Sequence, residues 1–291
     1  MDKLSKDLLD TVVKAYDLTD EEHKKVLLLY KQTKDNINQF IAELFMRYGD
    51  DGKINYDYYL RHHANDTERY ITEQVTNIAS VESSVASIIL GLVINFTYYK
   101  TLYNIEINLN IRTNFSTLRP DIVEYIKNYN WSGVPFSERI WHNRELLIRS
   151  LRQKLAQGLQ NGESLDKIAR QINKQFNRRA YESQRLIRTE SARVITDSML
   201  KAYKESGIVK EVMWLATLEQ NTCSECAALD GNRYRLDDPN KPKIPKHPNC
   251  RCAYSPVPFD DYKPQKRKEN ETKKTIDYVT FEQWKNERGI N

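Results

Sequence analysis

All four cysteines of the chain lie within 30 residues, and one histidine accompanies them. The five donors are Cys223, Cys226, His247, Cys250 and Cys252. Two residues separate Cys223 from Cys226 and His247 from Cys250, a spacing at which a tight turn directs both side chains toward one ion. Three thiolates and one imidazole would complete a tetrahedral shell, as in structural Zn²⁺ sites. The pattern therefore predicts structural zinc, with either Cys250 or Cys252 as the fourth ligand.

Two other interpretations of the cluster have to be weighed against zinc. Two disulfides are possible on cysteine count, but a reducing cytoplasm disfavours them. A catalytic deaminase site would place His-x-Glu ahead of Pro-Cys-x-x-Cys, whereas here the order is reversed and that Glu is missing. Without a metal, this proline-rich segment has too little apolar surface to order itself. A structural metal site is therefore the favoured interpretation.

The elements that must position these donors are a small β module and the long helices before it. Alternating apolar residues predict a strand over 211–218, and a second, isolated strand over 103–112. Apolar residues at helical spacing predict helices over 26–48, 66–102, 118–129, 136–158, 165–176 and 178–206. The fold class predicted is α+β, a mainly α-helical body with a small C-terminal zinc-stabilised β module.

Three regions follow from these patterns. Residues 1–134 form a helical N-terminal region, and residues 135–258 form a domain with helices over 136–206 and the β/zinc module over 211–258. Seven of the nine prolines lie between Pro239 and Pro264, where they keep the chain extended. Residues 259–291 are charged and poor in aliphatic side chains, so we expect a mobile tail with a short helix over 281–287.

The charge distribution divides the chain into two halves of opposite sign. Residues 1–138 hold 15 Lys and Arg against 20 Asp and Glu, and residues 139–291 hold 30 against 20. A basic half favours nonspecific contact with double-stranded DNA, although the cations could also simply solvate helix faces. Arg178, Arg185 and Arg188 are spaced to share one side of the predicted helix 178–206, and they are the candidate DNA contacts.

Membrane insertion and secretion are not expected. The longest uncharged stretch, Ser83 to Tyr99, contains several Ser, Asn and Thr residues and is apolar over only about two helical turns. The N-terminus mixes charged with apolar residues and has no continuous apolar segment of the kind that a signal peptide needs. We therefore expect the chain to be synthesised and to fold in a cytoplasm.

The motifs around the cluster resemble those of a known family. They are Arg188-Thr189-Glu190, Trp214-Leu215-Ala216-Thr217, the run from Thr222 to Gly231 that contains Leu229-Asp230-Gly231, and His247-Pro248-Asn249-Cys250-Arg251-Cys252. In this order they resemble the tailed-phage minor head proteins of the Mu F type, also called head-morphogenesis proteins. The resemblance covers residues 135–258.

The resemblance implies a role in the virion. Proteins of this family are minor capsid proteins of the capsid interior that associate with the phage portal protein and assist head assembly. Some accompany DNA during its ejection. We therefore expect the portal, capsid or scaffolding proteins and double-stranded DNA as partners, with a part in DNA packaging or ejection.

Some members carry a C-terminal toxin or ADP-ribosyltransferase domain, for which the 33 residues after Pro258 are too few, so no enzymatic activity is expected. The alternative is a zinc-ribbon DNA-binding regulatory protein, which would bind with sequence specificity.

Overall fold

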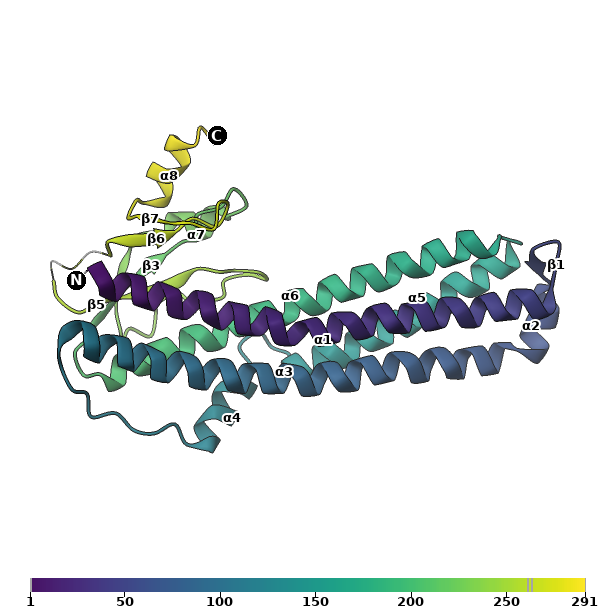
Figure 1. Ribbon diagram of the computed structural model, residues 1–291, viewed down its shortest axis with the longest axis horizontal. Coiled ribbons are helices and arrows are strands. Elements are labelled where there is room, and N and C mark those ends of the chain that lie inside the picture. Colours follow the sequence, from purple (N-terminus) through teal and green to yellow (C-terminus); the bar gives the residue numbers. More distant parts are fainter. Residues whose placement is uncertain (1, 261, 263, 291) are drawn as a thin grey trace. The chain divides into compact units, whose positions relative to one another are not determined.

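The computed structural model describes residues 2–260, 262 and 264–290, and it is mainly helical with small antiparallel sheets (Figure 1). In chain order the elements are α1 (Asp2–Tyr48), β1 (Gly49–Asp50), β2 (Lys53–Ile54), α2 (Tyr56–His62), α3 (Ala64–Leu109), α4 (Pro120–Asn128), α5 (Phe136–Gln160), α6 (Leu165–Glu205), β3 (Glu211–Leu215), α7 (Ser224–Ala228), β4 (Arg233–Arg235), β5 (Ala253–Val257), β6 (Lys266–Lys268), β7 (Thr275–Asp277) and α8 (Phe281–Glu287). The predicted mainly helical α+β class is confirmed.

The described residues form two compact units, each built from separate stretches of the chain. Unit 1 contains residues 2–20, 89–129 and those described within 187–290, whereas unit 2 contains residues 21–88 and 130–186. The long helices α1, α3 and α6 each contribute one part to each unit. The predicted boundaries after residues 134 and 258 therefore do not coincide with the division into units.

Unit 2 is a helical assembly around one apolar core. Apolar residues three or four positions apart on α1, α3, α5 and α6 face each other, because this spacing places them on one side of each helix. The core includes Ile37, Ile41, Ile71, Val75, Ile78, Leu147, Leu151, Ile168, Ile172 and Phe176. Gly158 allows close packing of α5 on α6, since a Cβ there would lie 2.5 Å from the side chain of Ile168. As predicted, α1 ends directly before Gly49.

The predicted strand over 103–112 is wrong, because α3 continues through it to Leu109. Leu102 and Ile105 are buried, at helical rather than alternate spacing. Polar side chains on this last part of the helix bond to α1 within unit 1: the Asn104 Nδ2 donates to the carbonyl of Asp7 and to Thr11 Oγ1, both at 2.9 Å. These contacts with a distant segment outweigh the local preference of β-branched residues for strands.

The predicted break between two helices near residue 177 is also wrong, since α6 is continuous from Leu165 to Glu205. Neither glycine nor proline interrupts this stretch, so nothing in its composition requires the helix to stop there. After position 177 the helix is supported by ion pairs of its own, since the Glu182 carboxylate accepts hydrogen bonds from both Arg178 and Arg179.

The β module lies in unit 1 and consists of three antiparallel strands in the order β4-β3-β5. Trp214 on β3 is fully buried opposite Tyr254 on β5, with the two rings edge to face and their centroids 5.5 Å apart. The Tyr203 hydroxyl of α6 donates to the Tyr254 carbonyl at 3.2 Å. The predicted strand over 211–218 is thus found as β3, and α6 is attached to the strand that follows the cysteine cluster.

The described residues after Phe259 form regular structure in place of the expected mobile tail. β6 pairs with β7, and α8 begins with a capping box in which Thr280 and Gln283 each satisfy the other's backbone N–H. The short helix predicted over 281–287 is confirmed. Arg267, Glu269 and Trp284 are buried, so residues that composition alone presents as solvated form long-range contacts.

One helix, α3, is long and apolar enough to cross a membrane by length and composition alone, and 44% of its most apolar window is buried. The core helix of a soluble protein passes the same test, so this is weak evidence for a membrane span.

Candidate metal centre

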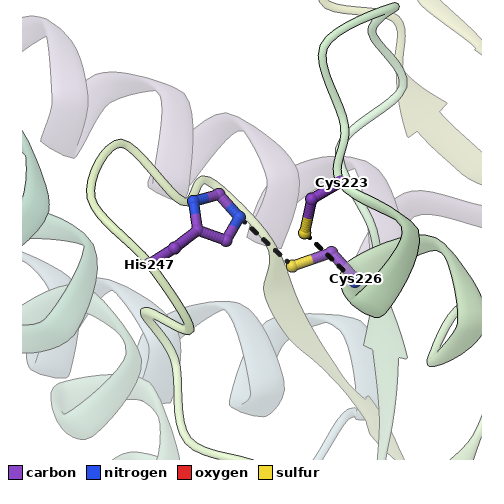
Figure 2. Close-up of side chains that lie close together, drawn as sticks. All are labelled: Cys223, Cys226 and His247. Carbon is purple, nitrogen blue, oxygen red and sulfur yellow. Dashed lines mark hydrogen bonds between the residues drawn. The ribbon is translucent and has the colours of Figure 1, made fainter.

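The structure brings all five predicted donors into one cluster in unit 1. The ligand atoms of Cys223, Cys226 and His247 lie within 4.8 Å of one another, and so do those of Cys226, Cys250 and Cys252. Cys226 belongs to both groups, and its sulfur lies 3.5 Å from His247 Nε2 and 4.0 Å from Cys250 Sγ. Figure 2 shows His247, from one loop, converging on Cys223 and Cys226 at the start of α7. All four cysteines are free thiols.

These distances fit tetrahedral coordination. With metal–sulfur bonds of about 2.3 Å and metal–nitrogen bonds of about 2.0 Å, two sulfurs around one Zn²⁺ lie roughly 3.8 Å apart, and a sulfur and a nitrogen roughly 3.5 Å apart. The observed separations of 4.0 and 3.5 Å are close to both values. The donor set is also rich in thiols, which suits a soft or borderline ion. Both separations are therefore compatible with one ion bound by these side chains.

The orientation of His247 favours metal binding. Its Nδ1 lies 2.9 Å from the carbonyl oxygen of Pro248, and this oxygen can only accept, so Nδ1 carries the proton. Nε2 then presents its lone pair toward Cys226. Fixing one ring nitrogen by a hydrogen bond while the other binds the ion is the usual arrangement of metal-ligating histidines.

The first Cys-x2-Cys turn is organised by a short helix. Cys223 precedes α7 in extended conformation, and its sulfur accepts the backbone N–H of Cys226 at 3.4 Å. Because α7 starts at Ser224, Cys226 points back to the same side as Cys223.

The second turn, from His247 to Cys250, is stabilised by one hydrogen bond within the turn and by another to α6. The N–H of Cys250 donates to the carbonyl of His247 at 3.1 Å, which closes the turn. Asn249 adopts a left-handed conformation with φ 63°, and its N–H donates to Thr189 Oγ1 at 3.0 Å. The Arg188-Thr189-Glu190 motif therefore contacts the metal loop directly.

The three buried cysteines, Cys226, Cys250 and Cys252, differ in how readily they lose a proton. The Cys250 sulfur accepts hydrogen bonds from the thiols of Cys226 and Cys252, and this lowers the pKa of Cys250. The same bond to Cys250 raises the pKa of Cys226, which acts as the donor. One thiolate thus forms readily within a cluster of buried thiols, and a positive ion would be needed to hold more than one.

Comparison with known proteins identifies the segment that contains this cluster. The sequence model of the family described as "Phage Mu protein F like protein" matches residues 149–255, a range that includes all five donors and Arg188-Thr189-Glu190. The chain carries a Mu F-like domain. The resemblance drawn from the motifs is therefore confirmed over this range.

Two curated relatives also match the chain. The NAD(+)--arginine ADP-ribosyltransferase EFV of Enterococcus faecalis is 28% identical over 179 residues, which are 56% of this chain and 37% of that protein. The Minor head protein GP7 of Bacillus phage SPP1 is 25% identical over 160 residues, which are 49% of this chain and 52% of that protein. The matches thus span about a third and about half of these relatives. No solved structure shows a significant match.

The other two residues of the Arg-Thr-Glu motif form ion pairs. Arg188 makes a bidentate contact with Asp20 of α1, at 2.7 and 2.8 Å. Glu190 is buried and accepts from Arg193 at 3.0 Å, and Arg193 also donates to the carbonyls of Ile126 and Lys127 at the end of α4. The motif therefore joins α1, α4 and the metal loop to α6 within unit 1.

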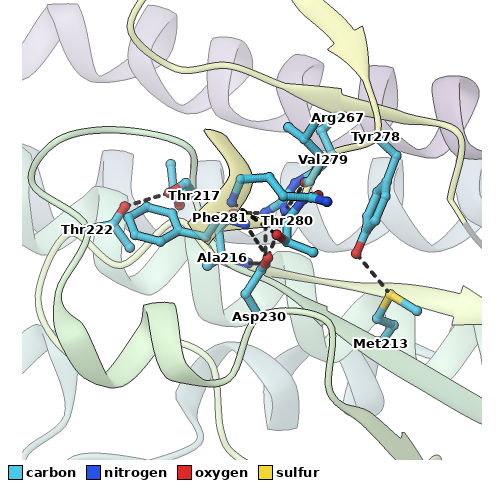
Figure 3. A network of polar contacts seen from close by, with 11 residues as sticks. Met213, Ala216, Thr217, Thr222, Asp230, Arg267, Tyr278, Val279, Thr280 and Phe281 are labelled. Carbon is cyan, nitrogen blue, oxygen red and sulfur yellow. Dashed lines mark hydrogen bonds and ion pairs between the residues drawn. The ribbon is translucent and has the colours of Figure 1, made fainter. Parts of the chain in front are cut away.

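Asp230 of the Leu-Asp-Gly motif connects the Mu F-like domain to the segment that follows it (Figure 3). Its carboxylate forms a buried bidentate ion pair with Arg267 of β6, with both N–O distances 2.9 Å. The same carboxylate accepts the N–H groups of Ala216 and of Phe281, the first residue of α8, at 2.8 and 2.7 Å. Sequence reasoning missed this role, because nothing in the local pattern links Asp230 to a cation 37 positions later.

The three arginines proposed for DNA contact have separate surroundings. Arg178 is paired with Glu182 at 3.0 Å, and Arg188 with Asp20. The Arg185 guanidinium lies over the ring of Tyr181, 5.9 Å from its centroid. Acidic partners already balance the charge of Arg178 and Arg188, which leaves them weaker candidates for phosphate contact than their spacing suggested.

Proposed function

We propose that this chain is a phage minor head protein that is built into the virion, associates with the portal on the inside of the capsid and assists head assembly. Two findings support the proposal: the Mu F-like domain over residues 149–255, and the similarity to a minor head protein of a Bacillus phage over half of that protein's length. The observation that carries it is the position of the cysteine cluster inside the matched range, where the motifs of the resemblance converge in space.

The metal, in this proposal, is Zn²⁺ with a structural role. Cys223, Cys226 and His247 would bind it, with Cys250 or Cys252 as the fourth ligand. Zinc has no redox chemistry and tolerates a thiolate-rich tetrahedral shell, which matches the donors present. Once bound, it would tie the loop before α7 to the loop before β5, so that the two Cys-containing turns become one unit.

Contact with double-stranded DNA is a further part of the proposal. The net positive charge of residues 139–291 supports it, and such contact would be nonspecific and strongly dependent on salt. A sequence-specific preference would instead favour the alternative of a zinc-ribbon regulator. Binding of the wild type and of Arg185→Ala to unrelated duplexes over a range of salt concentrations separates the two. Loss of one phosphate contact should reduce the slope of log affinity against log salt by about 1.

We also propose that the chain has no catalytic activity of its own, although one relative is named as an arginine ADP-ribosyltransferase. Among the described residues, His23, Ser183 and Glu82 come closest to a nucleophile with a base, with His23 Nε2 and Ser183 Oγ 3.0 Å apart. All three are buried in unit 2, so a substrate could not reach the hydroxyl. Incubation with NAD⁺ and an arginine-containing acceptor should yield no ADP-ribosylated product, and transfer by the purified chain would contradict this.

The deciding experiment is the composition of purified phage particles. We expect the chain in mature particles at low copy number, and we expect it to co-purify with the portal ring from disrupted heads. A phage carrying Cys226→Ser should incorporate less of the chain, whereas Ser224→Ala, an exposed neighbour on the same turn, should not change incorporation. Absence of the wild-type chain from both particles and portal preparations would overturn the proposal.

A further inference from the structure

Unit 1 contains a cavity of about 400 Å³ that neither the metal centre nor the proposed zinc role uses. One wall is the N-terminal part of α1, from Ser5 to Asp20. The others are part of α6, the end of β3, the strand β5 and the β6–β7 hairpin. We call this cavity the α1 groove. Its volume falls within the range of specific binding pockets and is large enough for a few apolar side chains.

The wall formed by α1 is apolar and incompletely covered. Leu9, Val12, Val13 and Tyr16 all line the α1 groove, at the spacing that places them on one face of the helix. Each remains partly exposed, whereas Leu8 on the same helix is buried. Leu215 and Ala253 continue the apolar surface from the β module. A face of this kind favours an occupant that supplies apolar side chains.

The rest of the lining is mainly cationic. Arg188, Arg251, Lys266, Arg267, Lys268 and Lys273 contribute to it, against only Asp17 and Asp20. Asp20 is already held by Arg188, and Arg267 by Asp230. Lys268 makes no ion pair within the part of the chain that the structure describes, and Lys273 donates only to the amide oxygen of Asn270. The hairpin thus places beside an apolar wall two lysines that have no acidic partner among the described residues. The complement of this pattern is an apolar segment with carboxylates.

We propose that the α1 groove binds an acidic amphipathic peptide segment of another head component, with its apolar side chains on Val12, Val13 and Leu215 and its carboxylates on Lys268 and Lys273. This inference rests on the proposed function, since it supplies the surface by which the chain would join other head proteins. Apolar contact would provide most of the affinity, and the lysines would select acidic over basic segments.

The test is a selection from a display library of random linear peptides on the full-length, metal-loaded chain. We expect the enriched peptides to combine large apolar residues with Asp and Glu. Val13→Glu, which puts a carboxylate on the apolar wall, and Lys273→Glu should each weaken their binding by about tenfold or more. Lys274→Glu is the matched control, because Lys274 is the exposed neighbour that does not line the groove, and it should bind as the wild type does.

Several results would overturn the inference. They are the absence of enriched peptides, the enrichment of basic peptides, and binding that Val13→Glu and Lys273→Glu leave unchanged while both variants keep wild-type circular dichroism and metal content. A further outcome is that the chain binds phosphatidylglycerol vesicles or duplex DNA but no peptide, and that Val13→Glu abolishes this binding. The groove would then have a different ligand, and the inference would be overturned. In phage, Val13→Glu should lower incorporation into particles. If the wild type is incorporated and Val13→Glu equally so, the α1 groove proposal fails while the proposed head function stands.

Discussion

The hydroxyl of Thr189 accepts the backbone N–H of Asn249 at 3.0 Å, across 60 residues of sequence. This bond joins the middle of α6 to the turn that carries His247 and Cys250. Since Asn249 is in a left-handed conformation, its N–H points out of the turn and needs a partner elsewhere. The position of two candidate metal ligands therefore depends on a helix that contributes no ligand.

Replacing Thr189 by Val should loosen the metal loop without changing any donor. The substitution keeps the shape of the side chain but removes the acceptor for Asn249, which should cost about 1 kcal/mol and lower metal affinity roughly fivefold. The measurement is the rate and midpoint of zinc transfer to a chromophoric chelator. Thr196→Val is the control, because Thr196 Oγ1 donates only within α6, to the carbonyl of Ala192. Equal effects of the two substitutions would show that Thr189 has no specific role at the loop.

Cys226 should be the least replaceable donor, because it belongs to both groups of neighbouring ligand atoms. We expect Cys226→Ser to lose stoichiometric zinc and to make residues 211–258 sensitive to proteases, since this segment has a small core of its own. Cys223→Ser should also release metal, and comparison of Cys250→Ser with Cys252→Ser identifies the fourth ligand. Elemental analysis of reduced protein and mass mapping of the protease fragments provide the readouts. Full protection of a metal-free Cys226→Ser variant would contradict the structural role of the ion.

The ion pair between Asp230 and Arg267 should contribute strongly to the stability of unit 1. Both side chains are at least 96% buried, so Asp230→Asn would leave the Arg267 guanidinium in a low-dielectric site without a balancing charge. We expect the free energy of unfolding to fall by about 3 kcal/mol or more. Limited proteolysis should then cut first within residues 264–290, because Asp230 also accepts the N–H of Phe281.

The matched control for this pair is Asp237→Asn. Asp237 pairs with Arg235 in the same module, at 3.1 Å, but both side chains are more than 70% exposed. Such pairs contribute little, so the substitution should leave the unfolding free energy nearly unchanged. A similar small change for Asp230→Asn would mean that the segment after Phe259 is held by its apolar contacts, such as those of Trp284.

The features that sequence predicted well are those encoded over a few residues. Cys-x2-Cys and His-x2-Cys place donors on tight turns wherever the chain goes, so the cluster is predictable from these two short motifs alone. The end of α1 before Gly49 and the short helix over 281–287 are likewise determined by residues close in sequence. In contrast, α3 extends through an alternating segment because Asn104 bonds to α1, a partner about 95 residues earlier. Nothing near residue 104 encodes that partner.

The segment after Phe259 shows the same limit of sequence-based prediction, in this case for charged residues. Its composition resembles a solvated tail, and only the position of Asp230 turns Arg267 into a core residue. Glu269 behaves similarly, since its carboxylate accepts the indole N–H of Trp284 at 2.7 Å and pairs with Arg288. Charged residues are predicted to be exposed because an isolated charge avoids burial, and this expectation fails where a distant residue supplies the opposite charge.

A buried carboxylate in unit 2 gives a prediction on pH dependence. Glu82 is 4% exposed, and burial raises its pKa to about 6, although hydrogen bonds from Ser183 and from the Tyr30 hydroxyl at 3.0 Å partly oppose the shift. Arg179 and Glu182 of α6 are the charged groups that act on Tyr30 beside it. The folded state therefore holds the Glu82 proton more tightly than the unfolded chain, in which the pKa is about 4.5.

The raised pKa of Glu82 determines the direction in which pH changes the stability. Between about pH 4.5 and pH 6 the folded state binds more protons, so this group lowers the free energy of unfolding as the pH rises, by about 2 kcal/mol in total. Glu82→Gln removes the charge and keeps an oxygen for the Tyr30 hydroxyl. We expect the variant to be more stable than the wild type by up to about 2 kcal/mol at pH 7, and nearly equal to it at pH 4.5. Denaturant titrations at the two pH values measure the difference.

The control is Glu73→Gln, because Glu73 is an exposed carboxylate on the same helix. The stability change that it causes should not depend on pH in this way. If Glu82→Gln were destabilised equally at both pH values, Glu82 would be held by its hydrogen bonds more strongly than burial disfavours it.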